Sequence, residues 1–357
     1  MDDSGEVVNG ILAKILRGDR NDSIRAIGES LAILSIAIGV GLAIVGLSGG
    51  SPIAALQTLA YGAFGTSLNL SGTIVKTVPL LLTGLSVAFA FRAGLFNIGG
   101  EGQLYAGAIG AAWVGSMDLG VSPWIHLPLT LLVAAVLGAC WGGIAGWVKA
   151  RRGVHEVINT IMLNYIAIYA VDYLVRGPLS AGSHTTRSRD VVPEAHLPVL
   201  WETPPIGVSV GVFLAFGLCL ACYWILFRTS FGIDLRTVGQ NADAAETVGI
   251  SSGRVFIIAM LVSGAITGIA GFIEITGVHH TLYAQFSPGY GFDGIAVALL
   301  GRSHPVAVVP AALLFGALRT ADRWLQLSAG VPKDIVIIIQ AIAILAVGLQ
   351  SARASRR

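Results

Sequence analysis

Charged side chains are scarce in this sequence. Only 12% of its 357 residues are Asp, Glu, Lys or Arg, about half the share that a soluble domain carries. Hydrophobic residues make up 54% of the chain, and the formal net charge is +2. This composition excludes a disordered protein, a nucleic-acid binder with a basic face and an ordinary cytosolic enzyme. The length would allow two or three soluble domains, but the scarcity of charge favours one membrane-embedded body.

Motifs that carry chemistry are missing as well. Three cysteines cannot make an extracellular disulfide framework. Cys219 and Cys222 are spaced like a metal-binding pair but lie in an apolar run without histidines or acids. The phosphate-binding pattern G-x-x-x-x-G-K-[ST] is absent, and no Ser/His/Asp arrangement can be assigned. We therefore expect no enzymatic activity, no ATP site, no metal and no cofactor in this chain.

Long apolar segments dominate the sequence instead. A helix needs roughly 20 apolar residues to cross a bilayer, and eight segments approach or reach this length. We predict an all-α integral membrane protein with a transmembrane domain over residues 30–350. Its eight predicted transmembrane helices are residues 31–48, 77–91, 103–116, 126–148, 154–175, 206–227, 255–278 and 335–350.

Two shorter apolar segments, residues 294–301 and 305–318, are separated by the polar residues 302–304. They form either one kinked span or a broken or re-entrant helix pair, which is tolerated only where protein surrounds it. The pair makes ten helices and returns the chain to the side on which it began. A single kinked span makes nine and leaves the C-terminal arginines outside. We therefore expect the broken pair.

Basic residues predict the orientation. With the N-terminus in the cytoplasm, every basic cluster falls inside, as the positive-inside rule requires. We thus predict a multi-pass protein of the cell membrane with both termini in the cytoplasm. The clusters comprise Lys14, Arg17, Arg20 and Arg25, then Lys149, Arg151 and Arg152, and finally Arg353, Arg356 and Arg357.

Three cytoplasmic segments follow from this orientation. Residues 1–29 place apolar side chains at helical spacing and predict an amphipathic helix on the membrane surface. A soluble helix packed on a partner is the alternative. Residues 351–357 form a short tail. The 27-residue loop 228–254 carries three arginines and three acids and is too long for a simple turn, so we expect another protein to dock there.

Small residues recur on two of the predicted helices. Gly138, Gly142 and Gly146 are four residues apart, and so are Gly264 and Gly268. This spacing lets the backbones of membrane helices approach closely. Close helix packing is the interpretation we adopt.

A polar break interrupts the apolar runs at residues 96–103. Three glycines among four residues stop a helix there, and Asn97, Glu101 and Gln103 add polar groups next to Phe96. Transport proteins build binding or gating sites from such breaks; an ordinary cytoplasmic turn is the alternative. Further polar residues within the predicted spans are candidates for the same path. They are Asn159, Asn164 and Glu274.

Four stretches of the chain resemble one family. Residues 94–103 read Gly-Leu-Phe-Asn-Ile-Gly-Gly-Glu-Gly-Gln, which is similar to the hallmark of nucleoside-type ABC importer permeases, members of the branched-chain amino acid, ribose and nucleoside permease group. The other stretches are residues 156–165, 236–250 and 289–301. In order, they cover most of residues 73–348. Gly100 stands at a variable place in the first motif.

The resemblance implies a permease subunit of an ATP-driven importer. In this family two permease chains form the pathway in the bilayer, separate ATPase chains bind below them, and an extracytoplasmic binding protein delivers the solute. The family's substrates are nucleosides or simple sugars, and the first motif favours nucleosides. The absence of a nucleotide-binding motif here agrees with this division of labour.

The resemblance also implies an ATPase-coupling segment within loop 228–254. We predict a short helix over residues 241–248, capped by Asn241 or Asp243 and ended by Gly249. Ala244 and Ala245 are expected to offer a small surface to a groove of the ATPase. The candidate coupling residues are Gly239, Asn241, Asp243, Ala244, Ala245, Glu246 and Gly249.

Two other classes of protein remain as alternatives. A secondary transporter driven by an ion gradient also uses broken helices and intramembrane acids, but it needs no docking loop for an ATPase. A membrane enzyme is disfavoured because no catalytic constellation is present.

Overall fold

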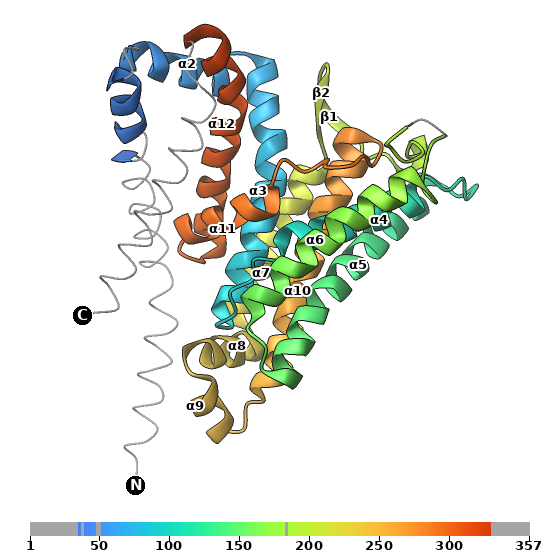
Figure 1. The fold of residues 1–357 in the computed structure, drawn as a ribbon, viewed down its shortest axis with the longest axis vertical. Coiled ribbons are helices and arrows are strands. Elements are labelled where there is room, and N and C mark those ends of the chain that lie inside the picture. Colours follow the sequence, from blue (N-terminus) through green and yellow to red (C-terminus); the bar gives the residue numbers. More distant parts are fainter. Residues whose placement is uncertain (1–34, 37–38, 48–50, 183–184, 330–357) are drawn as a thin grey trace.

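The computed structural model describes residues 35–36, 39–47, 51–182 and 185–329. The described part is mostly helical, with α8 and α9 at one end and the β1–β2 hairpin at the other (Figure 1). We call these the α9 end and the hairpin end. Of the predicted span 31–48 the structure describes residues 35–36 and 39–47, which are helical, whereas the predicted span 335–350 and the segments 1–29 and 351–357 lie outside the described residues.

Eleven α-helices with named bounds make up the bundle within the described residues. In chain order they are α2 (Pro52–Phe64), α3 (Ser67–Arg92), α4 (Gly100–Gly115), α5 (Pro123–Arg152), α6 (Glu156–Arg176), α7 (Gly211–Arg228), α8 (Ser230–Gln240), α9 (Ala242–Thr247), α10 (Ser252–Glu274), α11 (Tyr290–Leu300) and α12 (Pro305–Ala329). A π-helical turn, η2 (Ile275–His279), continues α10.

Six of these helices are long and apolar enough to cross a membrane: α3, α5, α6, α7, α10 with η2, and α12. The described part of the chain is thus that of a multi-pass membrane protein. Helix α4, predicted as a span, has only 16 residues, or about 24 Å at 1.5 Å per residue, which is less than the hydrocarbon thickness of about 30 Å. The predicted total of eight or ten stays a prediction.

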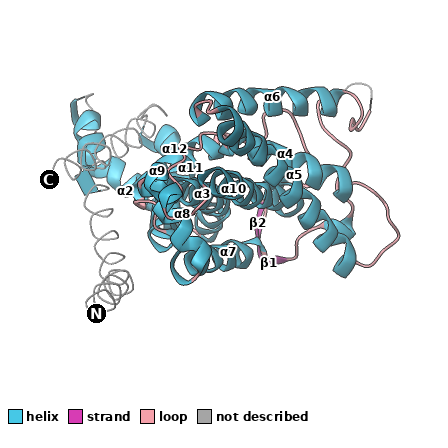
Figure 2. Cartoon of the chain, turned by 90° about the horizontal axis from the view of Figure 1, so that it is seen from below, coloured by secondary structure: helices cyan, strands magenta, loops and turns pink. Residues whose placement is uncertain are grey.

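Helix α3 occupies the centre of the bundle next to α10 (Figure 2). It has 26 residues, many more than the predicted segment 77–91. Hydropathy did not predict the first turns of α3, because they contain polar residues. In the structure these polar side chains are buried and hydrogen-bonded to backbone carbonyls. Thr73 donates to the carbonyl of Ala63 at 2.8 Å, and Asn69 donates to that of Tyr61 at 2.8 Å.

Helices α5 and α10 pack backbone against backbone, as the glycine spacing predicted. A Cβ atom at Gly138 would overlap the carbonyl oxygen of Gly264, and one at Gly264 would overlap that of Gly138. Gly142 lies equally close to the backbone of Met260. Only residues without side chains allow this approach.

Helices α11 and α12 are two separate helices and not one kinked span. Arg302 and Ser303 turn the chain between them, both with positive φ. The two helices are joined by an ion pair in which Arg319 of α12 donates to Asp293 of α11 at 2.7 Å. Helix α11 has 11 residues and cannot span, whereas α12 reaches 25 residues and is longer than the predicted segment 305–318.

The described part is mostly helical, as the predicted all-α class requires, and one short hairpin is added to it, in which β1 (Val199–Thr203) pairs antiparallel with β2 (Ile206–Ser209). The predicted span 206–227 therefore begins too early, because its first four residues form β2 and α7 starts at Gly211. Over only four residues, a strand and the first turn of a membrane helix can have the same apolar composition. Hydropathy therefore does not distinguish them.

Candidate functional site

The polar break of residues 96–103 joins α3 to α4 near the α9 end. Gly94, with φ +76°, turns the chain as α3 ends. Helix α4 then begins at Gly100 behind Gly99, whose N–H donates to the Oδ1 atom of Asn97 at 2.8 Å. The Asn97 side chain thus accepts from one of the N–H groups that the start of α4 leaves without an intrahelical partner.

Asn97 and Gln103 form a buried polar cluster with α10. The Nδ2 atom of Asn97 donates to Ser263 Oγ at 2.8 Å and to Gln103 Oε1 at 3.2 Å. The hydroxyl of Ser263 also lies 2.7 Å from that of Ser86 on α3. All four side chains are buried. The cluster ties the break to the two central helices.

Asn164 of α6 bridges the break from the other side. Its Oδ1 atom accepts from the N–H of Gly102 at 2.7 Å, and its Nδ2 atom donates to the carbonyl of Ile98 at 2.9 Å. Asn164 is fully buried. An amide side chain has both an acceptor and donors, so one residue satisfies two backbone groups that the helix break leaves open.

Glu101 connects α4 to the short helix α11. Its Oε2 atom accepts from the N–H of Gly291 at 2.7 Å, and the residue is 2% exposed. A Cβ atom at Gly291 would overlap the backbone of Glu101, so the first turns of the two helices touch. A carboxylate at helix N-termini meets favourable dipoles, and here one carboxylate lies between two of them.

Phe96 lies at the edge of the site. Its N–H donates to Glu156 at 3.3 Å, and Glu156 pairs with Lys149 at 2.8 Å. Its ring stacks on Phe91 with 4.8 Å between centroids and stays partly exposed.

The structure brings together five of the seven predicted pathway residues and leaves two apart. Asn159 lies on α6 with a buried Nδ2 atom that has no partner among the described residues. Glu274 lies toward the hairpin end, 3.3 Å from His279. Ser263, Gly291 and Lys149 were not predicted, and only Gly291 lay within a recognised motif. Whether any of the seven contacts substrate stays a prediction.

Loop 228–254 contains two helices where one was predicted. Helix α9 confirms the predicted short helix: Oδ1 of Asn241 accepts from the N–H of Ala244 at 3.0 Å, and Gly249 has φ +88°. Glu246 accepts from the hydroxyl of Ser252 and ties α9 to α10. Helix α8 was not predicted, because its apolar pattern is short and is interrupted by charged residues.

The expectation of two exposed alanines on α9 is wrong for Ala245. Ala244 is exposed, as is Asp243, but Ala245 is fully buried. The chain folds back after α9, where Ile250 donates to the Ala245 carbonyl at 3.0 Å. A six-residue helix must rest one face on the body. The exposed apolar side chain that sequence reasoning missed is Val248, which is 71% exposed.

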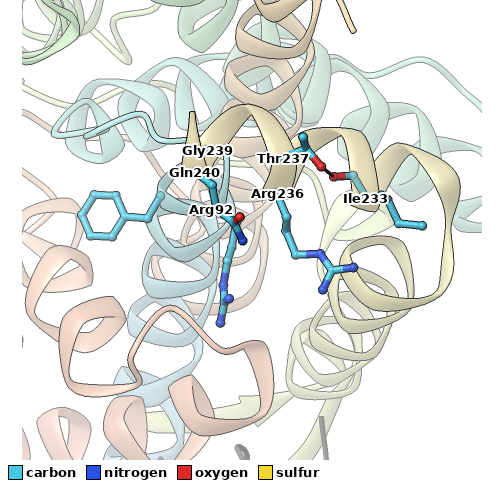
Figure 3. A pocket seen from close by; sticks show the side chains of 7 residues that line it. Arg92, Ile233, Arg236, Thr237, Gly239 and Gln240 are labelled. Atoms are coloured by element: carbon cyan, nitrogen blue, oxygen red, sulfur yellow. Dashed lines mark hydrogen bonds between the residues drawn. The ribbon is translucent and has the colours of Figure 1, made fainter. Parts of the chain in front are cut away.

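Gly239 brings α8 into backbone contact with the end of α3, just before the polar break. A Cβ atom there would overlap the carbonyl oxygen of Arg92, and the Cα atom of Gly239 would lie 3.1 Å from a Cβ placed on Gly94. A hollow of about 340 Å³ opens beside this contact. In Figure 3 the side chains of Arg92 and Arg236 extend in the same direction at its rim. Movement of α8 would therefore reach the end of α3 through backbone contact.

A histidine cluster lies at the hairpin end. The rings of His196 and His280 stack with 3.9 Å between centroids, and His279 pairs with Glu274. Burial lowers the pKa of His280, and the nearby imidazoles of His196 and His279 lower it further. Among the described residues no three His, Cys, Asp or Glu side chains are grouped to hold a metal ion.

The lowered pKa of His280 predicts that the loop around His280 opens more easily at acidic pH. The unfolded loop takes up a proton as the pH falls through about 6.5, while the folded loop keeps His280 neutral, so local stability falls below that pH. Hydrogen exchange at the Val191 amide, which donates to the His280 carbonyl at 2.8 Å, should quicken accordingly after correction for intrinsic rates. In His280→Asn the acid effect should shrink; an unchanged pH dependence would contradict the assignment.

Spanning helices around a buried polar break define a class, the multi-pass membrane transport protein. Comparison with known proteins then places the chain within that class. A family model described as branched-chain amino acid transport system / permease component matches residues 69–348. The chain belongs to this family, as its four motifs predicted.

Several relatives are similar over most of their length. The guanosine ABC transporter permease protein NupP of Bacillus subtilis is 39% identical over 88% of this chain and 91% of its own. The glucose ABC transporter permease protein TsgB13 of Haloferax volcanii is 35% identical over 88% and 84%. The nucleoside ABC transporter permease protein NupB of Lactococcus lactis is 31% identical over 91% of each. The chain is thus an ABC transporter permease, a transporter subunit and not an enzyme.

Proposed function

We propose that this chain is one of two permease subunits of an ATP-driven importer of nucleosides. The observation that carries the proposal is the 39% identity to a guanosine permease along nearly the whole chain. The glucose permease relative at 35% identity supports a simple sugar as the second candidate. A separate ATPase, a second and related permease chain, and an extracytoplasmic binding protein complete the transporter.

The distribution of charge supports a cytoplasmic α9 end. Basic residues outnumber acidic residues at that end, whereas acids outnumber bases at the hairpin end, which agrees with the positive-inside rule. The α9 end carries Lys149, Arg151, Arg152, Arg228, Arg236 and Arg254 with the acids Glu156, Asp234, Asp243 and Glu246, and the hairpin end carries Arg176, Arg187 and Arg189 with the acids Asp118, Asp172, Asp190, Glu194 and Glu202.

The contacts of α8 and α9 support a role in coupling. An ATPase that holds the exposed side of α9 would move α8, and α8 touches the end of α3 through Gly239 and Arg92. From there the polar break leads to α4, and Glu101 leads on to α11. ATP-driven motion would thus reach the short helix α11 through close backbone contacts and buried hydrogen bonds, which transmit displacement with little slack.

Val248→Asp tests this docking surface. Val248 is exposed in the chain alone, so the variant should fold normally, but a desolvated carboxylate in the ATPase groove should cost more than the roughly 1.4 kcal/mol that equals a factor of ten. We expect uptake to fall by at least about tenfold, with loss of ATP hydrolysis stimulated by the loaded binding protein. Val199→Asp, the same change on the exposed side of β1, is the matched control. Normal coupling in Val248→Asp would argue against docking at α9.

Uptake by cells decides the substrate class. Cells that lack this chain but keep its partners are compared with complemented cells, using labelled guanosine, other nucleosides, ribose and glucose. The proposal requires that only nucleoside uptake depends on the chain. Dependence of glucose or ribose uptake instead would establish the sugar alternative.

A further inference from the structure

Helix α6 has one face inside the protein and one face outside it. Figure 2 shows α6 along one edge of the bundle, away from α7. Its inner face is buried and includes Asn164. Its outer face is lined by aromatic and aliphatic side chains that are more than half exposed: Ile158, Met162, Tyr165, Ile166, Tyr169 and Tyr173.

The outer face of α6 differs from that of the neighbouring helix α5. On α5 the exposed aromatics, Trp124 and Trp147, stand toward the two ends, and aliphatic side chains fill the stretch between them. This is the pattern of a helix in contact with lipid, with aromatic side chains at the headgroup level. On α6, Tyr165 stands at the middle of the 21-residue helix and Tyr169 one turn further. Both lie away from the headgroup level.

Tyrosines at this depth need a polar environment. A phenol in hydrocarbon requires a hydrogen-bond partner, and the hydroxyls of Tyr165, Tyr169 and Tyr173 have none among the described residues. A lipid-facing surface would leave the hydroxyls of Tyr165 and Tyr169 unsatisfied in the middle of the membrane, whereas Tyr173 lies near the end of α6 and marks the outer end of the stripe.

We propose that Tyr165, Tyr169 and Tyr173 line the translocation path and stack in turn on the base of the passing nucleoside. This assignment rests on the proposed function. Successive rings are about 6 Å apart along the helix axis, at 1.5 Å rise per residue. Every base has a π face, so stacking tolerates any base, while the hydroxyls serve ribose or water. Similar rings at regular steps make no deep well, which suits a path whose solute is selected by a binding protein.

The chemistry of a thiol placed on this face tests the path directly. In a Cys140→Ser background, which removes the exposed native thiol, Tyr165→Cys and Tyr169→Cys are compared with Leu132→Cys on α5 and Leu220→Cys on α7. All four native side chains are at least half exposed. A charged, membrane-impermeant thiol reagent should modify the α6 cysteines at least about an order of magnitude faster, because lipid excludes it. In the assembled transporter, saturating guanosine with its binding protein should slow the reaction.

Two outcomes of the labelling would overturn the assignment. Equal, slow reaction at all four positions would place α6 against lipid. Disulfide cross-linking of Tyr169→Cys to the second permease chain, with no protection by guanosine, would make the face a subunit contact. A third outcome separates the two proposals. If the α6 cysteines react fast, guanosine does not slow the reaction and the wild-type transporter does not import nucleosides, then α6 still lines an aqueous path but the proposed substrate is wrong.

A second series of substitutions distinguishes the contribution of the Tyr169 ring from that of its hydroxyl. Tyr169→Phe should keep most of the guanosine uptake rate, whereas Tyr169→Leu should lower the maximal rate severalfold without altering the choice of nucleoside. Phe216→Leu on α7, another exposed aromatic position, is the matched control and should transport normally. Equal rates for Tyr169→Leu and Phe216→Leu would refute stacking.

Discussion

Gly264→Val is expected to prevent the native packing of α5 on α10. The new Cβ atom would overlap the carbonyl oxygen of Gly138 and approach Ala139. Both are backbone atoms of a helix that cannot give way locally. Overpacking of this kind costs about 1–3 kcal/mol or more, and here it separates α5 from α10, the helix whose Ser263 bonds to Asn97 of the polar break. Thermal unfolding of the detergent-purified chain, followed by size-exclusion chromatography, should show a large loss of stability and little folded protein.

Gly217→Val is the matched control for this prediction. Gly217 lies on α7, also in a spanning helix, and a Cβ atom there meets nothing within 4 Å. The same substitution should leave the unfolding temperature nearly unchanged. If both variants were equally stable, close backbone packing would not be what holds α5 and α10 together.

Asn164→Ala is expected to have the second largest effect. It leaves the N–H of Gly102 and the carbonyl of Ile98 without their partner at a fully buried position. Each orphaned group costs about 1–3 kcal/mol. The start of α4 should then loosen, and with it the contact of Glu101 to α11. We expect a lower unfolding temperature and strongly reduced uptake at normal substrate preference.

Asn159→Ala offers a control on the same helix. The Nδ2 atom of Asn159 has no partner among the described residues, so its removal should cost little stability. Thermal unfolding should therefore rank Asn164→Ala well below Asn159→Ala and the wild type. Equal unfolding temperatures would show that Asn164 does not brace the break.

Spacing and hydropathy predicted much of this architecture. Gly138 and Gly264 indicated close helix packing, the glycines after Asn97 indicated the break, and Asn241 and Gly249 marked the ends of α9. These features are local, because caps, breaks and small-residue stripes depend on a few neighbouring residues. The family resemblance likewise rested on short continuous stretches.

The parts that could not be predicted depend on distant contacts. Asn97 meets Ser263, 166 residues away, and Glu101 meets Gly291, 190 residues away. A buried polar side chain in a membrane span gives the same sequence signal whether it lines a path or braces the protein. Only the fold shows that Asn97, Gln103 and Asn164 brace the break. The burial of Ala245 was hidden for the same reason, since it depends on how the chain folds back after α9.

Reconstitution tests the central claim most directly, namely that this chain is a permease subunit driven by a separate ATPase. The chain, its second permease chain and its ATPase are placed in proteoliposomes, and import of labelled guanosine is measured with the binding protein outside and ATP accessible to the ATPase. We expect import that requires ATP, the binding protein and the exposed Val248 directly after α9. Import driven by a proton or sodium gradient without the ATPase would contradict it and identify a secondary transporter.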